Sequence, residues 1–402
     1  MKIENAHITQ KNVRTLLIAS ILAIVILQVP VFASTPATAI ADSSVKLLRE
    51  ALRTSKTDQN VLISPDSILT AMVMAENGAA GKTLSEMETA FGGISVSQYN
   101  RFLTKLHQRL SNAKTITYRP ANSIWYRKNA AVIKKAYLRR MTTSFQARVF
   151  AEPFDSRTVK KVNSWVNEAT DGKIPSIIRR LNPSNMMLLI NAVYFKGEWA
   201  EKYESSVKLR FTKESGRTQK ADTLCGEENE FVQICGAKGF VKYYSGGETA
   251  FMALLPPKGT SVRQYLEKLG GEDLIRGYKN RKSQNVIVRT RLPKFSYDFD
   301  ISLKAALKKM GIRQAFSKRA ADFSGMSENA LYIDEVLHKT HIELNESGTE
   351  AAAATAVIVS EFSAMPNPAV TIKKVYLNRP FVFAIIDTRT GIPLFLGVVN
   401  SI

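Results

Sequence analysis

The chain has 402 residues, of which 45% are hydrophobic and 23% are charged, a composition typical of a globular protein. This length permits one large domain or two to three smaller ones, with a core large enough to be stable without disulfides. The 56 Lys and Arg residues exceed the 35 Asp and Glu residues and give a formal charge of +21. The basic clusters are short and no nucleic-acid-binding module surrounds them, so we attribute the charge to a solvated surface and expect no nucleic-acid partner.

The N-terminus has the pattern of a signal peptide, which we assign to residues 1–33. Three basic residues precede the apolar run 16–27, and small residues follow it. The run is short for a membrane-spanning helix, which needs roughly 20 apolar residues, although an uncleaved anchor is the alternative. We expect cleavage after Ala33, or alternatively after Ala39. The protein is then secreted, either outside the cell or into the periplasm of a bacterium, and has no membrane attachment.

Hydrophobic periodicity and turn residues predict a mixture of helices and strands. In chain order these are a helix at 45–52, a strand at 60–64, a helix from Pro65 to Asn77, a helix opened by a capping box at Thr83–Glu86, helices at 97–111 and 156–171, strands at 186–195, 249–255 and 285–292, a helix at 299–311, and strands at 380–387 and 393–399. Helices and strands are grouped, which predicts an α+β fold. No repeat or low-complexity linker interrupts the chain, so we expect a short tail at 34–41 and a single domain over 42–402.

The two cysteines, Cys225 and Cys235, leave two readings open. They pair across a hairpin in an oxidising compartment, since Gly226 and the polar stretch 227–230 suit a turn, or they are two free thiols. The chain has no C-x-x-C sequence, which excludes a zinc ribbon and a thioredoxin-like motif.

The sequence carries no recognisable catalytic motif. It lacks H-E-x-x-H and G-x-S-x-G, and the segment 78–83 falls short of a phosphate-binding loop because Glu76 stands where glycine is required. His338 and His341 fall on an expected strand, where they face opposite sides and cannot bind one metal together. A buried, hydrogen-bonded histidine and a surface histidine are the expected outcome. We therefore expect no enzyme activity, no bound metal and no cofactor.

Six segments resemble the serpin family, and together they span about Val45 to Ile402. They are Asn60–Ile68 (NVLISPDSI), Val162–Asn167 (VNSWVN) with Thr170–Ile174 (TDGKI), Asn191–Trp199 (NAVYFKGEW), Leu292–Phe295 (LPKF), Leu377–Phe383 (LNRPFVF) and Gly397. Their occurrence in family order and at family spacing makes the resemblance specific. It implies a serpin fold of about nine helices around three β-sheets, with an exposed reactive-centre loop at about residues 346–370.

The start of this loop resembles the hinge of inhibitory serpins. The implied hinge residues are Glu346, Gly348, Thr349, Glu350, Ala351, Ala352, Ala353, Ala354 and Thr355. Ser347 stands where Glu, Lys or Arg is commoner, and we expect little effect from it. After cleavage, such a loop inserts as an extra strand into the largest sheet. Small side chains enter readily, whereas a bulky or charged one is left buried and unpaired.

The resemblance therefore implies a suicide-substrate inhibitor that traps the acyl-enzyme of a target serine protease in a covalent complex. A non-inhibitory serpin with a carrier, chaperone or storage role is the alternative, but such members tend to carry bulky, charged or Pro residues in the hinge. A cysteine protease is a second candidate target, and we expect the inhibitor to be a monomer.

Counting from Glu346 at family spacing places the reactive bond between Phe362 and Ser363. Phenylalanine before the bond suits the hydrophobic pocket of a chymotrypsin-like protease, with cathepsin-like and subtilisin-like targets as alternatives. The segment up to Pro380 is several residues longer than in common family members, so a bond one or two positions away is also open. The sequon at Asn345 lies beside the hinge, where a glycan would hinder insertion.

Other family positions concern the opening of the sheet. The resemblance places Ser64, Ser67, Asn191 and His338 in the polar network called the shutter, and Trp199 and Lys294, with Glu346, in the upper opening point called the breach. We interpret these residues as controlling conformation, and none as catalytic. Arg101, Lys105 and Arg109 form a basic row near the helix that binds heparin in some serpins. Binding of an anionic polysaccharide there is a secondary hypothesis, because such a row is usually the solvated face of a helix.

Overall fold

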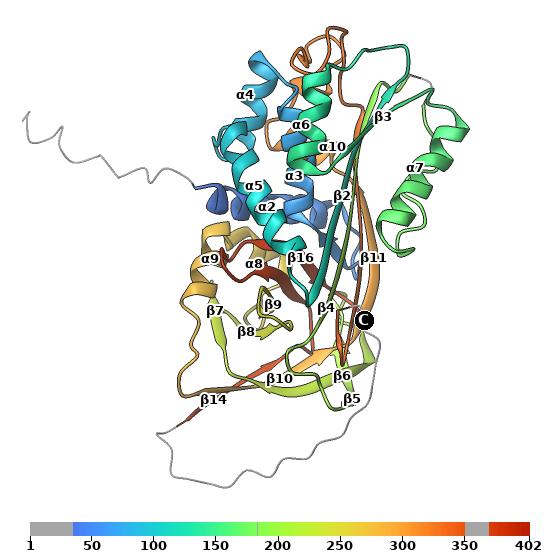
Figure 1. Ribbon diagram of the computed structural model, residues 1–402. Helices are drawn as coiled ribbons and strands as arrows, with labels where there is room; N and C mark the ends of the chain where they lie inside the picture. Colours follow the sequence, from blue (N-terminus) through green and yellow to red (C-terminus); the bar gives the residue numbers. More distant parts are fainter. Residues whose placement is uncertain (1–34, 183, 350–369) are drawn as a thin grey trace, which may run out of the picture. The chain divides into compact units, whose positions relative to one another are not determined.

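Three β-sheets organise the residues that the computed structural model describes, which are 35–182, 184–349 and 370–402. Within these residues nine α-helices surround the sheets (Figure 1). The expected α+β fold of about nine helices and three sheets is therefore confirmed. The signal peptide, the reactive bond and hinge residues 350–355 lie outside the described residues.

The main sheet has six strands in the order β11-β12-β13-β4-β2-β3. Their bounds are β2 (Ile116–Arg127), β3 (Arg148–Glu152), β4 (Met187–Glu198), β11 (Phe295–Ser302), β12 (Glu335–Asn345) and β13 (Gly348–Thr349). Strand β4 is buried without interruption from Met187 to Phe195, as the apolar run in the sequence predicts for a strand covered on both faces.

The core sheet is antiparallel and has the order β1-β16-β15-β9-β8-β7. Its strands are β1 (Val61–Ile63), β7 (Phe231–Ile234), β8 (Ala237–Tyr243), β9 (Thr249–Leu255), β15 (Phe381–Asp387) and β16 (Pro393–Val399). A four-stranded sheet has the order β14-β10-β6-β5, from β5 (Ser206–Thr212), β6 (Thr218–Glu228), β10 (Val286–Pro293) and β14 (Thr371–Tyr376). Strands β15 and β16 are buried along their whole length and form the centre of the core.

The helices cover both faces of the main sheet. They are α2 (Pro36–Thr54), α3 (Pro65–Glu76), α4 (Gly81–Ala90), α5 (Val96–Ser111), α6 (Lys135–Phe145), α7 (Ser156–Ala169), α8 (Val262–Lys268), α9 (Gly271–Lys279) and α10 (Lys304–Lys309), with a 3-10 turn at Gln314–Phe316. Helix α3 is buried over its whole length and packs against β4, β2 and β16, whereas α7 lies on the other side of the main sheet (Figure 1). None of the described helices is long and apolar enough to cross a membrane.

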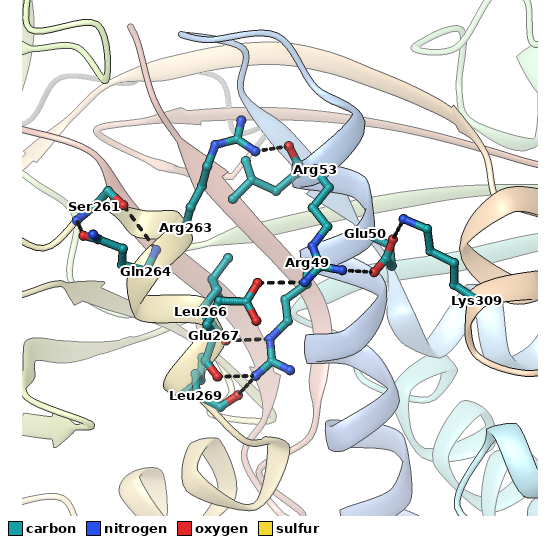
Figure 2. Close-up of polar contacts among 11 residues, drawn as sticks. Arg49, Glu50, Arg53, Ser261, Arg263, Gln264, Leu266, Glu267, Leu269 and Lys309 are labelled. Atoms are coloured by element: carbon teal, nitrogen blue, oxygen red, sulfur yellow. Dashed lines mark hydrogen bonds and ion pairs between the residues drawn. The ribbon is translucent and has the colours of Figure 1, made fainter.

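Two arginines join α2 to α8 by capping each other's helix ends (Figure 2). Arg49 donates from Nε to the carbonyl of Leu266 at 2.6 Å and from Nη2 to that of Leu269 at 2.6 Å. Arg263 donates to the carbonyl of Leu52, near the end of α2, at 2.5 Å. The last carbonyls of a helix lack i+4 partners within the helix, and those of Leu52 and Leu266 accept only a 3.3 Å hydrogen bond from the backbone N–H three residues later. The arginine bonds add a shorter, charged partner to each helix end.

Two expected helix starts are wrong. Helix α2 begins at Pro36, so most of the expected tail at 34–41 is helical: Thr35 caps the helix, and Ala39 to Ala41 are buried. Helix α4 begins at Gly81, and Thr83 is buried inside it rather than capping it. The Thr83 hydroxyl accepts the Asp322 N–H at 2.9 Å, while Glu86 accepts the N–H of Gln314 at 2.7 Å. The residues that suggested a capping box instead make contacts with distant segments.

The helix expected at 299–311 is also wrong in its first part. Residues up to Ser302 belong to β11, and only Lys304–Lys309 is helical. Phe299 lies opposite Thr340 in the antiparallel pairing of β11 with β12. Strand pairing with a distant segment has overridden a helical spacing that was read from local sequence alone.

The two cysteines lie in different parts of the fold, and both are free thiols. Cys225 is in β6, opposite Arg291 of β10, whereas Cys235 follows β7, which pairs with β8. The hairpin reading is therefore wrong and the reading as two free thiols is correct. A polar stretch between two cysteines does not distinguish a hairpin from a chain that crosses between sheets.

Candidate functional site

The candidate site is the line along which β4 and β12 meet in the main sheet. At one end these strands pair directly and in parallel, from Leu188 opposite Glu335 to Val193 opposite Thr340. At the other end β13 lies between them and pairs antiparallel with both. The same two strands are thus adjacent at one end of the line and separated by an inserted segment at the other.

The inserted segment is the first part of the predicted hinge. Gly348 pairs with Glu198, and Thr349 pairs with Gly197 on one side and Leu344 on the other. A Cβ atom at Gly348 would lie 2.1 Å from the Gly197 carbonyl oxygen, so no larger residue fits here without movement of the backbone. Thr349 is buried, and its hydroxyl is 2.7 Å from the Tyr244 hydroxyl.

Trp199 of the predicted breach holds the chain that leads into β13. Its indole N–H donates to the Asn345 carbonyl at 3.1 Å, and its backbone N–H donates to the Ser347 carbonyl at 2.9 Å. The indole is almost completely buried and stacks on the ring of Tyr244, with centroids 4.5 Å apart. The Trp199–Tyr244 pair therefore contacts the hinge at both ends of β13.

Lys294 and Glu346 form an ion pair beside Trp199, with Nζ and Oε1 3.0 Å apart. Both side chains keep about a third of their surface exposed, at 33% and 27%. Burial by itself raises the pKa of Glu346, but the hydrogen bond and charge of Lys294, with further hydrogen bonds from the backbone and Ser206, outweigh it, so this pKa lies below its ordinary value. The three predicted breach residues, Trp199, Lys294 and Glu346, are thus neighbours.

The predicted shutter residues meet where β4 and β12 are directly paired. Asn191 donates from its side-chain amide to Ser67 Oγ at 2.5 Å, and its amide oxygen bonds to His338 Nδ1. The Ser64 N–H donates to His338 Nε2 at 3.0 Å, and the Ser64 hydroxyl donates to the Leu394 carbonyl of β16 at 2.8 Å. All four residues are buried, so their bonds link α3, β4, β12 and β16 within the core.

The hydrogen bonds of His338 determine its protonation state. Because Nε2 accepts the Ser64 N–H, the ring proton is on Nδ1 and is donated to Asn191, so the imidazole is neutral. Burial lowers the pKa of His338 to about 3, because a charged imidazole would lose its hydration in the core. Protonation would add a proton at Nε2 and abolish the bond to Ser64.

His341 lies on the opposite face of β12 from His338, as strand alternation predicts. Its Nδ1 is 2.7 Å from Asp298 Oδ1. The prediction that the two histidines face opposite sides, with His338 buried and hydrogen-bonded, is confirmed, but His341 is not a surface residue, because only 17% of its side chain is exposed. Among the residues described, no group of three or more His, Cys, Asp or Glu side chains is placed to hold a metal ion.

The basic row on α5 does not behave as three equivalent charges. Arg101 and Lys105 are exposed, but Arg109 is only 26% exposed and donates from Nη2 to the buried Asp387 Oδ1 at 2.5 Å. Asp387 also accepts the Thr390 N–H at 3.0 Å, so this ion pair holds the turn between β15 and β16. Arg109 therefore has a structural partner, and Arg101 and Lys105 are the exposed charges of this row.

Two residues of the site escaped the sequence analysis. Asn122 of β2 accepts a hydrogen bond from the Asn191 amide, directly opposite it in the strand pairing, and Tyr244 contacts Thr349. Both come from segments with no family motif that we had identified. Ser347, which stands where Glu, Lys or Arg is commoner, is buried. Asn345 of the sequon accepts the Ser347 N–H at 2.9 Å with its side-chain oxygen.

Comparison with known proteins finds one family over almost the whole chain. A family model described as serpin (serine protease inhibitor) matches residues 38–402. Human neuroserpin is 32% identical over 385 residues, covering 91% of each protein. Mouse leukocyte elastase inhibitor A is 29% identical over 375 residues, covering 88% of this chain and 96% of the inhibitor.

A thermophilic serpin, tengpin, has been solved in two states that both resemble this chain. Its native state has a TM-score of 0.85 with 38% identity, covering 91% of this chain and 94% of tengpin. Its latent state has a TM-score of 0.78 with 35% identity, covering 91% of this chain and 97% of tengpin. The described fold is thus more similar to the native than to the latent state.

Proposed function

This chain belongs to the serpin family of non-enzymatic inhibitors, and we propose that it is a secreted suicide-substrate inhibitor of chymotrypsin-like serine proteases. The observation that carries the proposal is the division of the β4–β12 line. The hinge has entered the sheet by two residues at one end, while the two strands remain paired at the other. This is the arrangement expected of a sheet that can accept the rest of the loop.

The chemistry belongs to the target protease. Its serine oxygen attacks the carbonyl carbon of Phe362, and the peptide bond to Ser363 breaks, with the new amine of Ser363 taking a proton. The carbonyl of Phe362 is then an ester of the protease serine. The serpin's own residues perform no proton transfer. They provide the loop as a substrate and the sheet into which the cleaved loop inserts.

Insertion exchanges one strand pairing for two. The hydrogen bonds between 188–193 of β4 and 335–340 of β12 break, and the loop then bonds to both strands. The small hinge residues at 351–354 pass between the strands with little steric cost, whereas a charged residue would be buried without a partner. The gain of a strand in the sheet moves the attached protease and leaves its acyl-enzyme unhydrolysed.

Support for secretion and for the target comes from the sequence. Residues 1–33 have the basic, apolar and small-residue pattern of a cleaved signal, and Phe362 suits a hydrophobic specificity pocket. A cysteine protease of cathepsin type is the secondary target, because it attacks the same bond through a thiolate.

The test is to mix the mature chain with chymotrypsin and examine the products on denaturing gels and by mass spectrometry. We expect an SDS-stable complex and a released peptide that begins at Ser363. A panel of trypsin, elastase, subtilisin and papain tests the specificity, and Phe362→Arg should transfer complex formation from chymotrypsin to trypsin. Cleavage without any complex across the whole panel would contradict inhibition and favour the non-inhibitory alternative. A complex formed only with another protease would support the inhibitory mechanism but contradict the assignment of Phe362 as the residue before the reactive bond.

A further inference from the structure

An open cavity of about 560 Å³ lies where the four-stranded sheet meets the core sheet. Its walls come from the end of β5, the turn between β7 and β8, the segment that follows β9, and β14 with the residues after it. Figure 1 shows β14 and β8 on the same side of the described fold, far from α7. Cavities of roughly 300–1,000 Å³ are the usual size of small-molecule sites.

Four cationic side chains line this cavity, and no carboxylate does. They are Lys238 of β8, Lys258 after β9, Lys374 of β14 and Arg379 before β15. In the part of the chain that the structure describes, none of these four forms an ion pair, although neighbouring cations do. Arg289 of β10, for example, is 3.0 Å from Glu227 of β6. Four positive charges around one cavity repel each other, and a bound anion would relieve that repulsion.

Among these four cations, Arg379 has a side chain whose orientation is fixed by a hydrogen bond. It is half-buried, and its Nη2 donates to the Pro256 carbonyl at 2.6 Å, which orients the guanidinium. Burial lowers the pKa of Arg379, because the charge loses water without gaining an acidic partner. The adjoining backbone is held as well, since the Thr212 N–H donates to the Asn378 carbonyl at 2.9 Å. A guanidinium has five N–H donors, so most of its donors remain available to a ligand.

We propose that this cavity binds a small polyanion that carries two or more phosphate or sulfate groups. Arg379 supplies a planar pair of donors that matches one such group, and the three lysines neutralise the remaining charge. Leu255, Pro256 and Tyr376 also line the cavity, and they give the body of the ligand an apolar surface. The proposal does not depend on inhibition, because the cavity shares no residue with the β4–β12 line.

A bound polyanion would connect segments that are far apart in the sequence. Lys374 belongs to the strand that follows the reactive-centre loop, whereas Lys238 belongs to β8 of the core sheet and Lys258 to the segment after β9. A ligand that binds all three stabilises the folded state in proportion to its concentration relative to its Kd. Binding of the ligand would therefore stabilise the packing of β14 against the core sheet.

The experiment is a calorimetric titration of the mature chain with tripolyphosphate and, separately, with sucrose octasulfate at 150 mM salt. We expect one ligand bound per chain. The double variant Lys258→Gln, Lys374→Gln should lower the affinity by about tenfold or more, because each lost charged hydrogen bond weakens binding measurably. Arg379→Lys keeps the net charge but loses the planar pair of donors, and it should also weaken binding severalfold.

The matched control is Lys135→Gln, Lys160→Gln, which removes the same charge from exposed lysines on α6 and α7. It should leave the affinity within about twofold, since exposed distant charges are screened at this salt concentration. Binding of tripolyphosphate alone would identify a phosphate ligand, and binding of the sulfated sugar alone a sulfated one. An equal loss of affinity in the cavity double variant and in the control double variant would overturn the proposal. The absence of saturable binding of either probe would overturn it as well.

Discussion

The two ends of the β4–β12 line are built from opposite kinds of interaction. At the shutter, Asn191 and His338 are fully buried, and the hydrogen bonds that they make to Ser67, to Ser64 and to each other join neutral polar groups. At the breach, the Lys294–Glu346 ion pair keeps about a third of its surface in water, and an aromatic pair supports the inserted hinge. One end is closed by a buried network of neutral groups, and the other combines a partly solvated ion pair with a buried aromatic pair.

This difference indicates the direction in which the sheet opens. Exposed ion pairs contribute little to stability, because water solvates the separated charges nearly as well. A buried polar group that loses its partner, in contrast, keeps the full cost of its lost hydration. Entry of the loop should therefore begin at the breach and meet its main resistance at the shutter.

The largest expected effect comes from placing a charge in the inserted hinge. Thr349→Arg puts a guanidinium where a buried hydroxyl now faces Tyr244. The cost of burying an unpaired charge is several kcal/mol, so the number of inhibitor molecules consumed per protease should rise by about tenfold or more. Titration of chymotrypsin with the variant measures this number. Thr349→Ser keeps the hydroxyl and should behave like the parent protein, whereas equal behaviour of both variants would contradict the role of β13.

Removing the centre of the shutter should have the next largest effect. Asn191→Ala leaves Ser67, Asn122 and His338 without their shared partner inside the core. We expect the free energy of unfolding to fall by about 3 kcal/mol or more. The denaturant midpoint measures the change, with Asn112→Ala on the exposed end of α5 as the control. A change as small as that of the control would mean that the network is not important for stability.

The pH dependence tests the neutral state of His338. Its folded pKa, about 3, lies below the ordinary value of 6.5, so the unfolded chain binds more protons between these two values. Stability from this residue is therefore fully present above pH 6.5 and is lost as the pH falls, by about 1.4 kcal/mol per pH unit.

His338→Gln should flatten this dependence, because glutamine does not titrate. Denaturant midpoints at several pH values between 7.5 and 4.5 measure the slope for both proteins. Identical slopes in the parent and the variant would show that other groups determine the acid sensitivity. The same comparison for His341→Gln provides the control, because His341 contacts Asp298 on the opposite face of β12 and takes no part in the shutter.

The smallest effect is expected at the breach ion pair. A double-mutant cycle with Lys294→Gln and Glu346→Gln should give a coupling free energy below about 1 kcal/mol, because both side chains are partly solvated. The cycle is measured by denaturant midpoints at low salt and again at 0.5 M salt, where the coupling should shrink. A coupling free energy above about 2 kcal/mol would contradict the view that the breach ion pair contributes much less to stability than the shutter network.

Local patterns in the sequence determined much of this protein. The apolar run at 187–195 became a buried strand, and the alternation of β12 placed His338 and His341 on opposite faces. The family segments placed Ser64, Ser67, Asn191 and His338 in a single network, and the structure brings those four side chains together. Such features depend on residues that are near in sequence or on motifs with known spacing.

Only the tertiary structure decided where distant segments meet. Thr83 and Glu86 bind the backbone of Asp322 and Gln314, in the segment after α10, instead of capping α4. Strand β11 occupies the start of an expected helix, and Arg109 pairs with Asp387. The cationic cavity likewise collects residues from β5, β8, β9 and β14 and from the segments that connect strands. Hydrogen bonds and burial across hundreds of residues outweigh local preferences worth less than about 1 kcal/mol each, and a pattern read along the chain does not contain them.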